Sequence, residues 1–296
     1  MVRVGRCLDH ALVSFAGGER SREGSGRGER ATRPPVEWLQ FNMLFHRPVV
    51  GLTMASSGLW NFETPPGFRG LDLRGELVRY SRNLPHWRQQ GVTYWVTFRQ
   101  ADSLPRARLD QLRSWRDREL DRIEALGGDD TRPNSGLSAA AALEALAEET
   151  MKQVEIWLDQ GMGSCVFNDP ECRGLMEKAL MRDQGERHEL SAWVIMPNHV
   201  HLLIRPLQGE QLERWLQEVK RSSSRMINTY LQRSGKLWSR ESHDRIVRDG
   251  EHLWRCLRYL GRNPLRAGLN QNQFSLWYHP EWEACGWGSQ TAAARS

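Results

Sequence analysis

The alternation of apolar and polar residues predicts several β-strands in this chain. Each predicted segment is short, rich in β-branched and aromatic residues, and bounded by turn-forming residues. The segments are residues 92–98, 189–196, 199–205 and 244–248. Only Pro197 and Asn198 separate the second segment from the third, and a two-residue break between apolar runs predicts a β-hairpin.

Helical periodicity predicts the elements that lie between these strands. Apolar residues recur three and four positions apart in residues 106–126, 138–158, 169–181, 212–230 and 251–262. Asn263-Pro264 is expected to end the last helix, because the residue before a proline disfavours helical backbone. Antiparallel strands interleaved with helices predict the α+β class: a ferredoxin-like antiparallel sheet with helices packed on it, plus a helical insertion around residues 106–160.

The N-terminal part of the chain has a different composition. Residues 1–72 are rich in Arg, Gly, Ser and Pro and show no sustained periodicity. We expect a low-complexity, basic and disordered extension there. It is either a nucleic-acid-binding tail or an extension upstream of the true start. One globular domain is expected over residues 73–288, followed by a tail over residues 289–296.

Charge and composition narrow the class of partner. A net charge of +5 and a pI of about 9.1 favour a polyanion, although many proteins with such a charge bind no nucleic acid. No segment approaches the roughly 18 apolar residues of a membrane span, and the N-terminus lacks the order of a secretory signal. A cytoplasmic protein without membrane contact is therefore expected. The five cysteines include no Cys-x-x-Cys pair that would indicate a zinc site.

His199 and His201 are the first candidates for chemistry. Side chains alternate between the two faces of a strand, so these two imidazoles share one face of the predicted strand 199–205. Two imidazoles at this spacing can bind one divalent ion and leave its other sites to substrate oxygens. Paired histidines in a strand also occur in purely structural positions.

Tyr259 and Asn263 are the second pair of candidates. They are four residues apart in the last predicted helix and therefore lie on one face, about one turn from each other. A tyrosine nucleophile and an amide oxygen able to complete a metal site would be presented together. The alternative is that Tyr259 is an ordinary half-buried aromatic residue and Asn263 a cap before Pro264.

Several ordered motifs together resemble one family. Met196-Pro-Asn-His-Val-His-Leu-Leu203 and Arg258-Tyr-Leu-Gly-Arg-Asn-Pro-Leu-Arg-Ala-Gly-Leu269 are similar to segments of the REP-associated tyrosine transposases, which are HUH endonucleases with one catalytic tyrosine. The similarity extends through residues 83–87, 157–161 and 237–249, and so over roughly residues 73–287.

The resemblance implies a metal-dependent endonuclease and strand transferase that acts on single-stranded, hairpin (REP-like) DNA through a 5′-phosphotyrosine intermediate. It implies His199 and His201 as metal ligands, Tyr259 as the nucleophile, and Mg²⁺ or Mn²⁺ as the ion. Asn263 would supply the third ligand, although related transposases have the longer Gln there. His243 is a rival third ligand, because its strand is expected next to that of the histidine pair.

The resemblance also implies contacts with DNA. On the helix after the hairpin, the expected phosphate contacts are Lys220, Arg221 and Arg225, whose alternative is a solvated helix face. Ahead of the first predicted strand, the residues expected to read DNA are Arg79, Arg82 and Trp87, for which core and surface roles are the alternative. The expected protein is a nucleoid-associated monomer or homodimer.

Two other functions remain open at this point. In a metal-dependent hydrolase, water would attack in place of Tyr259. A protein that binds hairpin DNA without cutting it would share the same sequence motifs. The substitution Tyr259→Phe separates these possibilities, because only the transposase requires the phenol to form a covalent adduct with DNA.

Overall fold

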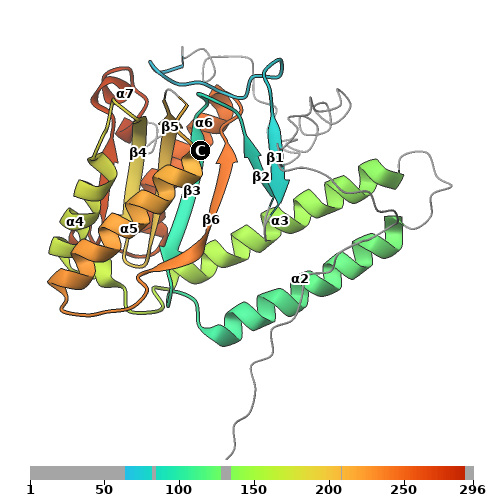
Figure 1. The fold of residues 1–296 in the computed structure, drawn as a ribbon, viewed down its shortest axis with the longest axis horizontal. Coiled ribbons are helices and arrows are strands. Elements are labelled where there is room, and N and C mark those ends of the chain that lie inside the picture. Colours follow the sequence, from blue (N-terminus) through green and yellow to red (C-terminus); the bar gives the residue numbers. More distant parts are fainter. Residues whose placement is uncertain (1–63, 82–84, 128–134, 208, 291–296) are drawn as a thin grey trace, which may run out of the picture. The chain divides into compact units, whose positions relative to one another are not determined.

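A computed structural model describes residues 64–81, 85–127, 135–207 and 209–290 of the chain (Figure 1). The strands are β1 (Val78–Ser81), β2 (Pro85–Arg88), β3 (Tyr94–Gln100), β4 (His188–Met196), β5 (His199–Pro206), β6 (Trp238–Ile246) and β7 (Ser275–Tyr278). The helices are α2 (Arg106–Gly127), α3 (Ser135–Asp159), α4 (Pro170–Met181), α5 (Leu212–Tyr230), α6 (Gly250–Arg266) and α7 (Pro280–Ala284). None of the helices described is long and apolar enough to cross a membrane.

The main sheet has five antiparallel strands in the order β6-β3-β5-β4-β7. Its first four strands follow the order expected of a ferredoxin-like fold, in which the strand after each helix lies at an edge of the four-strand core. The expected α+β class is confirmed. β4 and β5 form the predicted hairpin, and β5 lies at the centre of the sheet, with two strands on either side.

Alternation along β5 divides the apolar core between the two faces of the sheet. Figure 1 shows that α4 and α5 cover one face of the sheet. The side chains of Val200, Leu202 and Ile204 belong to the apolar core on that face. Leu203 points to the other face, where it packs with apolar residues of α6. His199 and His201 alternate in phase with Leu203, so both lie on the α6 face.

Helices α2 and α3 form the predicted insertion between β3 and α4. Figure 1 shows them side by side and antiparallel. At the end of the pair nearest the sheet they share a small apolar cluster that includes Leu104, Trp157 and Leu158. The insertion therefore has its own small apolar core, and one end of the helix pair lies beside the sheet.

The structure corrects the predicted start of the packed domain. Residues 64–72 were expected in the disordered extension, yet Phe68 is buried in the α6-side cluster. The Leu71 amide also donates to the Arg248 carbonyl oxygen at 3.0 Å. A single aromatic residue in a Gly- and Pro-rich stretch shows no periodicity, and this is why the sequence pattern missed it. The rest of the predicted extension, residues 1–63, lies outside the described residues, as does most of the predicted tail.

Three strand and helix boundaries also differ from the prediction. The β1–β2 hairpin was not predicted, because its strands are four residues long and contain polar residues and Pro85. β6 begins at Trp238 instead of residue 244, since an edge strand with one wet face has a weak apolar pattern. α6 continues past Asn263 to Arg266 with Pro264 inside it. Pro264 has no N–H to donate to the Leu260 carbonyl oxygen, so the helix continues there without that hydrogen bond.

Candidate active site

The two histidines predicted as ligands are side by side on the central strand. His199 and His201 are 1% and 0% exposed, and their ring centroids lie 4.7 Å apart in an edge-on arrangement. Burial lowers the pKa of His199 to about 3. Burial, and then the neighbouring His199, His243 and Arg266, lower the pKa of His201 well below its ordinary value. Both rings are therefore neutral at pH 7, which is the form that binds a metal ion.

Asn198 fixes which nitrogen of His199 carries the proton. The Asn198 amide nitrogen donates to the backbone oxygens of Leu158 and Met162, at 3.2 and 3.0 Å. Carbonyl oxygens only accept, so the Asn198 side-chain oxygen must be the atom that faces His199 Nδ1 at 2.7 Å. Nδ1 consequently donates, and the lone pair of His199 lies on Nε2.

His201 is held in a similar way from the neighbouring strand. Its Nδ1 lies 2.7 Å from the hydroxyl of Thr97, which stands directly opposite it in β3. Its ring stacks on Trp95 with 5.3 Å between centroids. In the described part of the chain, no group hydrogen-bonds to Nε2 of either His199 or His201. The Thr97 hydroxyl can accept a hydrogen bond from His201 Nδ1, which leaves the lone pair of His201 on Nε2 beside that of His199. Two buried imidazole nitrogens without partners, each held from its other nitrogen, suit a metal ligand pair.

Tyr259 meets this pair from α6. Asp249 caps the N-terminus of α6, where its carboxylate accepts a hydrogen bond from the His252 amide. The apolar stripe of α6 packs on the sheet. This packing brings the Tyr259 ring 5.4 Å from that of His201 and 5.7 Å from that of Trp95, edge-on to both. The convergence of phenol and imidazoles that the sequence predicted is present.

Asn263 lies one turn beyond Tyr259 and is completely buried. Neither its side-chain oxygen nor its nitrogen has a hydrogen-bond partner among the residues that the structure describes. A buried amide with both polar atoms unsatisfied costs several kcal/mol, about 1–3 kcal/mol for each atom. Such a group is suited to bind something that the protein itself does not supply, such as a metal ion or a substrate oxygen.

Two acidic residues of α3 complete the surroundings of Tyr259, and the sequence analysis missed both. The Glu155 carboxyl group acts electrostatically on the Tyr259 hydroxyl. The Asp159 carboxylate forms an ion pair with the Arg266 guanidinium at 3.5 Å. The Arg266 guanidinium lies 5.2 Å from the centre of the Tyr259 ring. Burial raises the pKa of Tyr259 well above its ordinary value, and Glu155 and Asp159 add to this effect. Burial also raises the pKa of Asp159 to about 6, against the opposing effect of Arg266.

The donor atoms present fit a hard or borderline divalent ion. They are two neutral imidazole nitrogens and a buried amide oxygen, and substrate oxygens can take the other positions. Among the described residues, no group of three or more His, Cys, Asp and Glu side chains is arranged to hold a metal. Asn263 as the third ligand stays a prediction.

The position of His243 corrects one expectation. Its strand, β6, does not adjoin β5, because β3 lies between them. Thr97 pairs with His201 on one side and with His243 on the other, so the three side chains share a face of the sheet. His243 is thus one strand further from His201 than predicted, and Thr97 occupies the intervening position.

The predicted DNA contacts of α5 lie on the other face of the sheet. Lys220 is turned inward, and its ammonium donates to the carbonyl oxygens of residues 239, 240 and 241 at 3.2–3.5 Å and lies over the Phe98 ring. Burial lowers its pKa to about 8. Arg221 and Arg225 are exposed there. DNA binding by this face stays a prediction.

Of the residues predicted to read DNA ahead of β3, only Trp87 has a described side chain. It is half-buried and packs against the core on the α4 and α5 side. The backbone of Arg79 belongs to β1, opposite Trp87, but its side chain and all of Arg82 lie outside the described residues.

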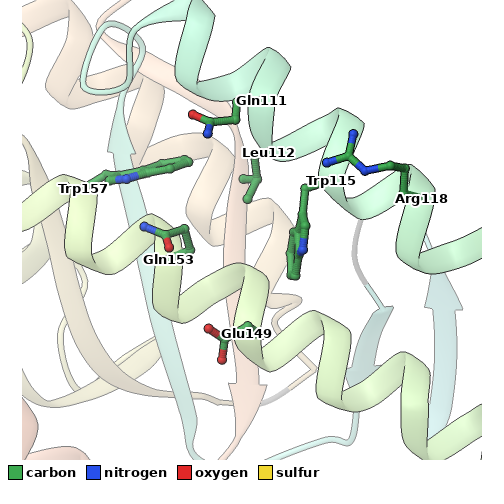
Figure 2. Close-up of a pocket in the computed structure, with 7 residues that line it drawn as sticks. All are labelled: Gln111, Leu112, Trp115, Arg118, Glu149, Gln153 and Trp157. Carbon is green, nitrogen blue, oxygen red and sulfur yellow. The ribbon is translucent and has the colours of Figure 1, made fainter.

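Two cavities lie near these elements. The smaller, of about 170 Å³, is lined by Trp95, Glu155, Arg245, Arg255, Cys256 and Tyr259 and therefore opens beside the phenol. The larger, of about 330 Å³, lies between α2 and α3, and Figure 2 shows Trp115 and Trp157 on its two sides. The larger cavity is lined by neither the histidine pair nor Tyr259, whereas the smaller is lined by Tyr259 but not by the histidines.

Comparisons with known proteins gave one family match and one similar fold. Residues 168–246 match a family model described as "Transposase IS200 like". This match confirms the resemblance to transposases and supports a function in DNA processing. The matched segment contains His199 and His201 but ends before Tyr259, and it begins after α3.

One solved structure is similar to the chain, and it is described as a REP-associated tyrosine transposase bound to a REP hairpin. The two are 14% identical with a TM-score of 0.33, over 65% of this chain and 75% of that chain. No curated protein matches the chain.

Proposed function

We propose that this protein is a metal-dependent tyrosine transposase, which cleaves and rejoins single-stranded DNA beside a hairpin through a 5′-phosphotyrosine intermediate. The observation that supports this most strongly is the meeting of His199, His201 and Tyr259 in one buried place, from two elements far apart in the sequence. The match to IS200-like transposases adds to it, because the histidine pair lies in the matched segment.

The residues divide the chemistry between them. A phosphodiester repels nucleophiles through its own negative charge, so its nonbridging oxygens must be neutralised and a nucleophile aligned. Nε2 of His199 and of His201, with the Asn263 amide oxygen, would hold Mg²⁺ or Mn²⁺, which supplies Lewis-acid charge neutralisation when bound. The Tyr259 oxygen attacks phosphorus, and the DNA strand leaves with a 3′ hydroxyl.

Covalent attachment makes the reaction reversible. The phosphotyrosine bond replaces the phosphodiester bond that breaks, so a 3′ hydroxyl can attack it and reseal a strand without an external energy source. Arg245 lines the cavity beside Tyr259, and its guanidinium is suited to bind a phosphate of the incoming strand. The preference for a hairpin rests on the family resemblance of the sequence motifs.

The test is an adduct assay with single-stranded DNA that carries a hairpin from beside the gene. We expect a denaturant-resistant protein–DNA band in Mn²⁺ that EDTA abolishes. The variant Tyr259→Phe should give no adduct, and the matched control Tyr230→Phe should behave as the native protein. Tyr230 is suitable because it is 47% exposed and lies on α5, across the sheet from the site.

Other outcomes would support the two alternatives. Cleavage that continues in Tyr259→Phe would identify a hydrolase in which water attacks. Tight binding of the hairpin without cleavage in Mn²⁺ would identify a protein that only binds DNA. Either result contradicts the proposed function.

A further inference from the structure

Helix α3 of the insertion reaches the proposed active site, and its last turns are fixed there from two directions. Asn198, the residue before the histidine pair, binds the backbone oxygens of Leu158 and Met162. Arg266, on the same helix as Tyr259, pairs with Asp159. The end of α3 is therefore positioned by contacts to the two elements that carry the proposed chemistry.

Glu155 lies one turn before Asp159 on this fixed end of the helix. It lines the 170 Å³ cavity together with Tyr259 and Trp95. Its side chain is half-buried, and its electrostatic effect on the Tyr259 hydroxyl is larger than that of Asp159. The two groups are outside standard hydrogen-bond geometry. Contacts of catalytic groups are often long before the substrate is bound.

A role for Glu155 as a third metal ligand is not supported. Among the described residues, no third acidic, histidine or cysteine side chain groups with His199 and His201 in a metal-binding arrangement. The charged groups that act on His201 are His199, His243 and Arg266. Glu155 lines the same cavity as Tyr259, and neither His199 nor His201 is among the residues that line it.

We propose that Glu155 is the general base that accepts the phenolic proton of Tyr259 when the DNA strand is attacked. This inference rests on the proposed function. The Tyr259 O–H bond breaks and its proton moves to a Glu155 oxygen. The phenolic oxygen then bonds to phosphorus, and the 3′ oxygen leaves with the electron pair of the broken P–O bond and takes a proton from water. On resealing, Glu155 returns the proton to the departing tyrosine oxygen.

The surroundings of Glu155 and Asp159 favour Glu155 as the general base. The Asp159 carboxylate pairs with Arg266 at 3.5 Å, whereas Arg245 and Arg266 act on Glu155 without an ion pair among the described residues. Burial raises the pKa of Glu155, which strengthens its carboxylate as a base. A phenol carries its proton at neutral pH, so a base in the same cavity assists its attack on phosphorus.

The experiment measures the single-turnover rate of adduct formation on the labelled hairpin strand in Mn²⁺, together with DNA affinity and thermal unfolding. Glu155→Gln keeps the size and polarity of the side chain but removes the base. We expect its rate to fall on the order of 10²–10⁴-fold, the usual contribution of a general base, with DNA affinity unchanged. The matched control is Glu149→Gln, an exposed glutamate of the same helix.

A second comparison separates proton transfer from a structural role. Replacing Tyr259 by 3,5-difluorotyrosine gives a more acidic phenol, which needs a base less. The fluorinated residue should restore at least about tenfold of the rate lost in Glu155→Gln and change little when Glu155 is present. Glu155→Asp, with a shorter carboxylate, should keep more activity than Glu155→Gln.

The outcomes distinguish this inference from the proposed function. If the native protein forms the adduct and Glu155→Gln forms it at the same rate, the base assignment fails and the proposed function stands. If the rate falls but fluorination restores none of it, Glu155 has a structural role and the inference is overturned. If the native protein forms no adduct at all, both fail.

Discussion

Asn198 connects the two histidines proposed as metal ligands, the turn of the hairpin and the end of α3, so Asn198→Ala is an informative perturbation. The substitution removes three hydrogen bonds, of 3.2 Å to Leu158, 3.0 Å to Met162 and 2.7 Å to His199. The Leu158 carbonyl keeps a bond from the Gly161 amide, and the Met162 carbonyl keeps only a weak one from the Cys165 thiol, whereas His199 Nδ1 loses its partner. The Met162 carbonyl and His199 Nδ1, at about 1–3 kcal/mol each, give an expected loss of about 2–6 kcal/mol in the free energy of unfolding.

The same substitution should weaken metal binding. Without the Asn198 oxygen, His199 is no longer held in the tautomer that presents Nε2, and loss of such an orienting partner typically reduces metal affinity about 10–100-fold. Urea denaturation and calorimetric titration with Mn²⁺ measure the two effects. Asn228→Ala is the control, because Asn228 also bonds a backbone oxygen and a neighbouring side chain, but on α5. Native Mn²⁺ affinity in a destabilised Asn198→Ala protein would refute the argument about the tautomer.

Two further predictions concern buried ionisable groups on the other face of the sheet. Lys220→Met should lower the free energy of unfolding by about 1–3 kcal/mol, because three carbonyl oxygens lose their donor. It should leave the salt dependence of DNA binding unchanged. If the slope of log binding constant against log salt concentration falls by about one, Lys220 binds a phosphate and the prediction is wrong. His188 donates from Nε2 to the Leu180 carbonyl oxygen, and burial lowers its pKa. The folded protein therefore keeps His188 neutral, while the unfolded chain takes up a proton there below about pH 6.5. Its stabilising contribution is therefore present above that pH and is lost as the pH falls, by up to about 1.4 kcal/mol per pH unit. The free energy of unfolding of His188→Gln, measured in guanidinium between pH 7 and 5, should fall less steeply with pH than that of the native protein, by up to that amount. Equal slopes would contradict the role given to His188.

The parts of the site that were predictable from the sequence depend on short-range periodicity. Alternation in β5 places His199 and His201 on one face, and a four-residue spacing places Asn263 beside Tyr259. The meeting of these two pairs required the packing of α6 on the sheet, which the family resemblance supplied. Local pattern and resemblance together therefore predicted the imidazoles and the phenol.

The residues that were missed act through contacts between distant segments. Glu155 belongs to an insertion whose docking depends on Asn198, and no periodicity relates residue 155 to residue 259. Asn198 looked like a turn residue only, although its side chain binds two carbonyl oxygens some forty residues earlier in the chain. Lys220 was expected to face solvent because it lies off the apolar stripe of α5. The start of β6, which the sequence did not predict, covers it.

The central claim is that the phenol of Tyr259 attacks a phosphate held at His199 and His201. The most direct measurement is mass spectrometry of the tryptic peptides after reaction with the hairpin strand in Mn²⁺. Cleavage after Arg258 and Arg262 isolates residues 259–262, which contain one tyrosine. We expect this peptide to carry a nucleotide joined through its 5′ phosphate, and none in His199→Ala. A nucleotide on any other peptide, or cleaved DNA with no modified peptide, would contradict the account.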